Sequence, residues 1–159
     1  MNINSRKDSG GRVTLSVLDL ADSPRPDPVV TFTAAKEHLL YVDDDRQVLE
    51  MGRRFLTHLG YRVTALTSSL EAREVFLNRP QAFDLVITDL NMPLVSGLDL
   101  AAAMVQVRPE MPIILYSGVS EAVPPEIASQ AGIRGVLRKP TNIADLAGII
   151  RRLLDTEEE

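Results

Sequence analysis

Apolar residues come in short runs that alternate with longer stretches at helical spacing, beginning at about residue 38. The apolar runs predict strands, the stretches with apolar residues three and four apart predict helices, and glycine or proline ends several of them. This pattern repeats five times. The predicted strands are 38–42, 61–66, 84–88, 113–116 and 134–137, and the predicted helices are 48–59, 69–78, 97–107, 121–131 and 142–154. Strands that alternate with helices predict a parallel sheet covered by helices on both faces.

The first 36 residues lack this regularity. Three alternating prolines in Ser23–Pro28 are typical of an extended linker. Val13, Leu15 and Val17 alternate with polar residues and weakly indicate a strand, which is either disordered or paired with another segment because a single strand is not stable alone. We therefore expect a flexible extension with a proline-rich linker over 1–36, a globular domain over 37–155 and an acidic tail over 156–159.

Composition narrows the function classes. Among the 159 residues there is no cysteine and there are only two histidines, which excludes thiol chemistry and disfavours a histidine-rich metal site. The net charge of −5 gives no expectation of nucleic-acid binding. No apolar run reaches the length of a membrane span, and no secretory signal is visible at the N-terminus, so we expect a soluble, cytoplasmic protein that does not bind membranes. Met51 and Met104 are predicted to lie in the core.

Polar residues with reactive or ligand-binding side chains lie directly after the predicted strands. They are Asp43–Asp45, Asp89, Asn91, Ser117 and Lys139. The carboxyl ends of parallel strands meet at one edge of a sheet, where such folds bind ligands. Clustered carboxylates without histidine or cysteine favour a hard cation such as Mg²⁺, and a lysine and a hydroxyl beside them suit phosphoryl transfer to a carboxylate nucleophile.

The segments LLYVDDD, LVITDLNMP followed by glycine, ILYSG and RKP resemble the four signature segments of the response-regulator receiver domain of two-component signalling. This resemblance implies a flavodoxin-like α/β fold, a doubly wound (βα)5 five-stranded parallel sheet. It implies that Asp89 accepts the phosphoryl group and that Asp44 binds Mg²⁺ directly. Asp43 would act on the metal mainly through water, and Asn91 would offer its backbone carbonyl.

The resemblance also assigns roles to the other two segments. Ser117 resembles the hydroxyl that contacts the phosphoryl group, and Lys139 the lysine that pairs with phosphate and precedes a cis proline, Pro140. Gly97 matches the glycine after the phosphorylation-site loop. Receivers often carry an aromatic residue where this chain has Val136, which puts the aromatic part of the usual switch in doubt.

The same resemblance implies a histidine kinase or a phosphotransfer protein as phosphodonor. It implies an unknown downstream protein partner on the face made by the fourth helix, fifth strand and fifth helix, with no nucleic acid bound. The domain would catalyse only its own phosphorylation and dephosphorylation and would not otherwise be an enzyme.

Three alternatives stay open: a receiver fragment of a hybrid histidine kinase, a binding-only pseudo-receiver, and an aspartate-nucleophile phosphohydrolase. Asn91 argues against the last, since such enzymes usually carry an acid/base aspartate there.

Overall fold

The computed structural model describes residues 2–7, 12–18, 30–33, 36–118 and 123–156, and the chain divides into two compact units, 1–36 and 37–159. Within the described ranges, every helix is too short or too polar to cross a membrane.

The first unit contains three antiparallel strands in the order β1-β2-β3. They are β1 (Asn2–Lys7), β2 (Arg12–Leu18) and β3 (Val30–Thr33). The alternation at Val13, Leu15 and Val17 therefore marks a strand, and its pairing partners come from the same segment. The sequence of β1, NINSRK, has little apolar alternation, which explains why the pattern did not predict it. The proline-rich stretch Ser23–Pro28 lies outside the described residues.

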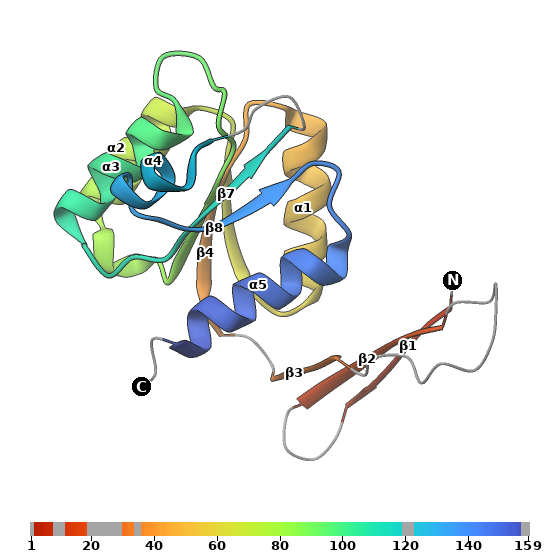
Figure 1. Ribbon diagram of the computed structural model, residues 1–159. Helices are drawn as coiled ribbons and strands as arrows, with labels where there is room; N and C mark the ends of the chain where they lie inside the picture. The colour runs from red at the N-terminus through yellow and green to blue at the C-terminus, as the bar shows by residue number, and fades with distance from the viewer. Residues whose placement is uncertain (1, 8–11, 19–29, 34–35, 119–122, 157–159) are drawn as a thin grey trace. The chain divides into compact units, whose positions relative to one another are not determined.

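The second unit is a five-stranded parallel sheet with the order β5-β4-β6-β7-β8, and helices lie on both of its faces (Figure 1). This confirms the predicted flavodoxin-like α/β class. The strands are β4 (His38–Val42), β5 (Arg62–Leu66), β6 (Leu85–Thr88), β7 (Ile113–Ser117) and β8 (Ile133–Arg138). The helices are α1 (Arg46–His58), α2 (Ser69–Asn78), α3 (Gly97–Val107), α4 (Pro125–Gln130) and α5 (Ile143–Thr156), with a short 3₁₀ turn η1 (Pro80–Ala82).

Side-chain caps set the start of α1, α2 and α3. Asp45 accepts hydrogen bonds from the backbone of α1, Ser68 from Glu71 in α2, and Ser96 from Asp99 in α3. Each cap satisfies backbone N–H groups that have no partner within the helix, and substituting such a residue by alanine typically costs about 1 kcal/mol. The predicted range of the helix at 69–78 is confirmed.

The sheet has two differently packed faces. Helices α2, α3 and α4 cover one face, where a continuous core includes Leu40, Val86 and Leu115 from the strands and Phe76 and Met104 from the helices (Figure 1). Helices α1 and α5 cover the other face, to which Tyr41 and Tyr116 belong because neighbouring residues of a strand point to opposite faces. Only apolar strands fit between two helical layers, as the buried runs of β4 and β6 show.

Several sequence predictions differ from the structure. The helix start predicted at residue 121 lies outside the described residues, and helix α4 runs from Pro125; Pro124 is extended because a residue before proline is forced out of the helical region. Met104 is buried as predicted, but the prediction for Met51 was wrong, since its side chain is 68% exposed. The last helix runs to Thr156, past the predicted end at Leu154, and residues 157–159 lie outside the described residues.

Leu94 combines two unfavourable features in the loop between β6 and α3. Its backbone has a φ of +73°, and its side chain is 85% exposed. The left-handed conformation costs an L-residue roughly 1–2 kcal/mol, and asparagine tolerates it better because its short polar side chain bonds locally. An exposed leucine gains almost nothing from packing in return.

We therefore expect Leu94→Asn to raise the free energy of unfolding by about 0.5 kcal/mol, measured by urea denaturation. Leu70→Asn is the matched control, because Leu70 is 46% exposed but lies within α2, where asparagine is a poorer helix former. The control variant is expected to lose stability. A loss of stability in Leu94→Asn would contradict this account of the loop.

Candidate functional site

The backbone hydrogen bonds of the sheet continue past the strand ends and hold the predicted site residues. Asp43 N–H donates to the carbonyl of Leu66 at 3.2 Å, and Asp89 N–H donates to that of Val42 at 2.9 Å. Lys139 N–H donates to the carbonyl of Ser117 at 2.7 Å. The residues that follow four neighbouring strands are thus fixed relative to one another at one edge of the sheet.

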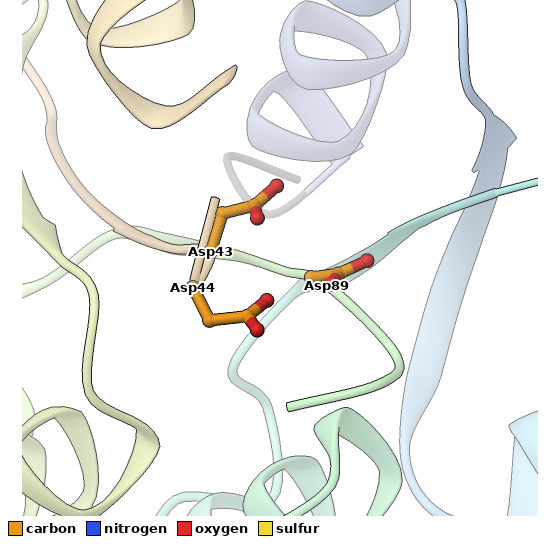
Figure 2. Close-up of side chains that lie close together, drawn as sticks. All are labelled: Asp43, Asp44 and Asp89. Atoms are coloured by element: carbon orange, nitrogen blue, oxygen red, sulfur yellow. The ribbon is translucent and has the colours of Figure 1, made fainter. Parts of the chain in front are cut away.

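Three carboxylates converge at this edge. Asp43, Asp44 and Asp89 each offer an oxygen, and these oxygens lie within 4.8 Å of one another (Figure 2). Asp43 and Asp89 are buried, whereas Asp44 is exposed. Like charges this close repel, so the arrangement is stable only where cations reach it.

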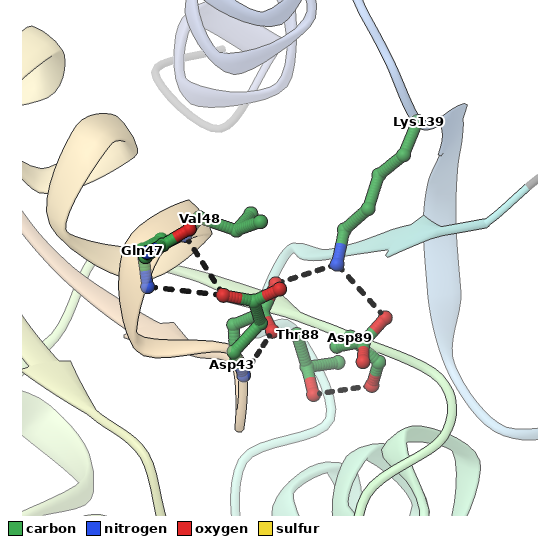
Figure 3. Close-up of polar contacts among 7 residues, drawn as sticks. Asp43, Gln47, Val48, Thr88, Asp89 and Lys139 are labelled. Carbon is green, nitrogen blue, oxygen red and sulfur yellow. Dashed lines mark hydrogen bonds and ion pairs between the residues drawn. The ribbon is translucent and has the colours of Figure 1, made fainter.

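Lys139 supplies one of these cations. Its Nζ lies 2.6 Å from Oδ2 of Asp43 and 3.3 Å from Oδ1 of Asp89, so that one ammonium bridges two carboxylates (Figure 3). Burial disfavours the charged form of Lys139, but the hydrogen bond and charge of Asp43, followed by those of Asp89, outweigh it and raise the pKa of the ammonium. Lys139 is therefore a fixed positive charge of the site.

The second oxygen of Asp43 is also bound. Oδ1 accepts a hydrogen bond from the backbone N–H of Asp45 at 2.9 Å, and Asp45 in turn caps α1 through Gln47 and Val48 (Figure 3). Asp45 is therefore the N-cap of α1. This chain of bonds fixes the orientation of the fully buried Asp43 carboxylate.

The Asp89 carboxyl lies in an electrostatically unfavourable environment. Burial and then the negative charge of Asp43 raise its pKa, and Lys139 compensates only in part. The carbonyl of Asp89 accepts a hydrogen bond from the Thr88 hydroxyl at 2.9 Å. An ionised carboxylate with little compensation is a good candidate for a nucleophile, or for a ligand of a further cation.

The structure also places the remaining predicted residues. Ser117 is buried at the end of β7, Asn91 is exposed two residues after Asp89, and the bond between Lys139 and Pro140 is cis. Gly97 allows a close approach of backbones, since a Cβ there would lie 2.0 Å from the carbonyl oxygen of Asp89.

Sequence reasoning missed one neighbour of the site. The ring of Tyr116 lies 5.2 Å from Nζ of Lys139, measured to the ring centroid. The available signal was an aromatic residue directly before Ser117, at the end of a predicted strand.

The model of the response regulator receiver domain matches residues 39–151. The chain belongs to the response regulator receiver domain family. The matched segment contains every site residue named above. Receiver domains of two-component systems generally bind Mg²⁺ at an acidic pocket, and this structure has a cluster of three carboxylates.

Individual relatives agree with this assignment. The chain is 38% identical over 105 residues to the transcriptional regulatory protein GlrR of Escherichia coli. This match covers 66% of this chain and 23% of GlrR. It is 28% identical over 117 residues to the response regulator SaeR of Staphylococcus aureus, covering 74% of this chain and 50% of SaeR. The match thus spans half or less of these relatives. A response regulator receiver domain from Clostridium thermocellum superimposes with a TM-score of 0.72 at 28% identity, covering 77% of this chain and 97% of that one.

The raised pKa of Asp89 predicts a specific pH dependence of stability. A group whose pKa is higher in the folded state contributes stability that is present below its ordinary pKa, here 3.8, and that is lost as the pH rises through the folded-state value. We expect Asp89→Asn to gain stability relative to the wild type as the pH rises from about 4 to about 7, measured by urea denaturation in EDTA.

Asp89→Ala is the matched control, because it also removes the carboxyl group and should show the same trend with pH. A difference from wild type that stays constant or shrinks over this range would contradict the electrostatic account of Asp89.

Proposed function

We propose that this receiver domain accepts a phosphoryl group from a phosphohistidine onto the Asp89 carboxylate, with Mg²⁺ bound beside it. The observation that supports this most strongly is the position of Asp89 between two further carboxylates and the Lys139 ammonium. In the proposed reaction a carboxylate oxygen attacks phosphorus, the phosphorus–nitrogen bond breaks, and the imidazole leaves and takes up a proton. The product is an acyl phosphate, which water later hydrolyses.

The donor set fits Mg²⁺. Asp43, Asp44 and Asp89 offer oxygen ligands only, and Mg²⁺ favours a few carboxylates with several retained waters. Asp44 and Asp89 would bind the ion directly, Asp43 mainly through water, and Asn91 through its backbone carbonyl. When bound, the ion neutralises negative charge on the transferred phosphoryl group.

The remaining roles belong to residues of the chain. Lys139 already lies 3.3 Å from Oδ1 of Asp89 and would donate to a phosphoryl oxygen on that carboxylate. Ser117, at the neighbouring strand end, would offer its hydroxyl to another phosphoryl oxygen. These groups act only on the domain's own phosphoryl group, so we propose no enzymatic activity on other substrates.

The proposed partners follow from the same reaction. A histidine kinase or a phosphotransfer protein would supply the phosphohistidine. A downstream protein would bind the face formed by α4, β8 and α5. On this face Ile127 is 47% exposed and Val136 is 49% exposed. Two exposed apolar residues on neighbouring elements suit a protein partner.

We expect the wild type to take up radiolabelled phosphoryl groups from phosphoramidate in the presence of Mg²⁺, and Asp89→Asn to take up none, because an amide is a poor nucleophile. Label is measured on the denatured protein. Asp45→Asn is the matched control: it changes an adjacent carboxylate to a residue that caps helices equally well and should be labelled like the wild type. Equal labelling of Asp89→Asn and wild type would exclude Asp89 as the acceptor.

Asp44 allows the metal site to be tested separately from the transfer. Its side chain is exposed, so Asp44→Asn should fold normally. Because the loss of an outer-shell partner alone lowers metal affinity about 10- to 100-fold, we expect removal of a direct ligand to weaken Mg²⁺ binding at least about tenfold, measured by calorimetric titration. Asp45→Asn again serves as control and should bind like the wild type. Unchanged affinity in Asp44→Asn would exclude Asp44 as a direct ligand.

A further inference from the structure

The Lys139 ammonium has an aromatic neighbour in addition to its two carboxylates. The ring centroid of Tyr116 lies 5.2 Å from Nζ, within the range in which a cation is attracted to the face of an aromatic ring. The Lys139 side chain is 20% exposed, so water screens this attraction less than it would at an open surface. The Tyr116 ring and the Lys139 ammonium therefore interact where little water reaches them.

Tyr116 and Lys139 are held by two paired strands, β7 and β8. Tyr116 lies opposite Leu137 in the pairing of β7 with β8, and the next residue, Ser117, accepts a backbone hydrogen bond from Lys139. The register of β7 against β8 is thus fixed directly beside the contact between the two side chains. A fixed register means that the ring defines where the flexible lysine side chain passes.

The ring also forms one wall of a cavity of about 250 Å³ between α1, α5 and the sheet. The cavity is lined mainly by apolar groups, among them Phe55, Pro140 and Leu146, and Lys139 is also one of its lining residues. These apolar side chains do not compete with a phosphoryl oxygen for the lysine, whereas Asp43 at 2.6 Å does. An aromatic face attracts the ammonium without occupying its N–H donors in the way that a carboxylate does.

Tyr116 lies on the opposite face of the sheet from Val136. Val136 is paired with Leu115, a core residue of the α2–α4 side, and Tyr116 is the next residue along β7. The valine provides no aromatic ring on that side. In this chain the ring beside the site instead faces α1 and α5 and contacts the lysine.

We propose that Tyr116 is a positioning residue for Lys139: the face of its ring holds the ammonium where it can engage a phosphoryl group on Asp89. This proposal rests on the proposed function. It assigns the ring, and not the hydroxyl, as the active part of Tyr116.

The test measures binding of beryllofluoride, a mimic of the phosphoryl group, at saturating Mg²⁺ by fluorine NMR. We expect Tyr116→Leu to weaken beryllofluoride binding about three- to tenfold, as the loss of one partly desolvated cation–π contact implies. Tyr116→Phe keeps the ring and should stay within about twofold of wild type. The Mg²⁺ affinity measured without beryllofluoride should not change in either variant, which separates positioning of Lys139 from general damage to the site.

Two further arms identify the physical cause. In a Lys139→Met background, Tyr116→Leu should have no additional effect, because the cation is already absent. Phenylalanine analogues with two and with three ring fluorines at position 116 keep the shape of the ring but weaken its attraction for cations, so affinity should fall stepwise even if Tyr116→Leu folds poorly.

Equal losses in Tyr116→Phe and Tyr116→Leu, an undiminished effect in the Lys139→Met background, or no trend with fluorination would each overturn the proposal. If the wild type itself bound no beryllofluoride with Mg²⁺ present, the proposed function would fail, and this proposal with it.

Discussion

The site depends on one ion pair, between Lys139 and Asp43. Asp43 is fully buried, and a charged carboxylate in that setting is stable only when its oxygens are bound and its charge is balanced. One oxygen accepts the backbone N–H of Asp45, and the other accepts the Lys139 ammonium. Without the lysine, an uncompensated buried charge would remain beside a second carboxylate, that of Asp89.

This pair explains why the strand order matters for the chemistry. Asp43 follows β4 and Lys139 follows β8, and β6 and β7 lie between these strands in the sheet. The ammonium therefore reaches back across the ends of two strands, passing Tyr116 on β7 and Asp89 after β6. A shift in the register of any of these strands would move one member of the cluster away from the others.

The strand ends were predictable from sequence because each buried strand is an apolar run that stops at a polar residue. Asp43, Asp89, Ser117 and Lys139 were found in this way, and their convergence follows from the parallel topology alone. Met51 was misjudged although the spacing contained the answer: it is two residues after the buried Leu49, about 200° around the helix. The contact between Tyr116 and Lys139 was not predictable, since it depends on the path of a long side chain across two strands.

Lys139 is not shared equally by its two carboxylates, and the asymmetry shows how the site would respond to a new group. Its nitrogen is 2.6 Å from Asp43 and 3.3 Å from Asp89, so the more deeply buried carboxylate has the stronger bond. A phosphoryl group on Asp89 would add about two negative charges on the weaker side and draw the ammonium toward it. Asp43 would then need a replacement cation, and a divalent metal at the acidic cluster would supply that charge. Once a phosphoryl group is on Asp89, the mutual repulsion of the carboxylates would therefore couple the metal to the lysine, because each would make it easier for the other to serve that group.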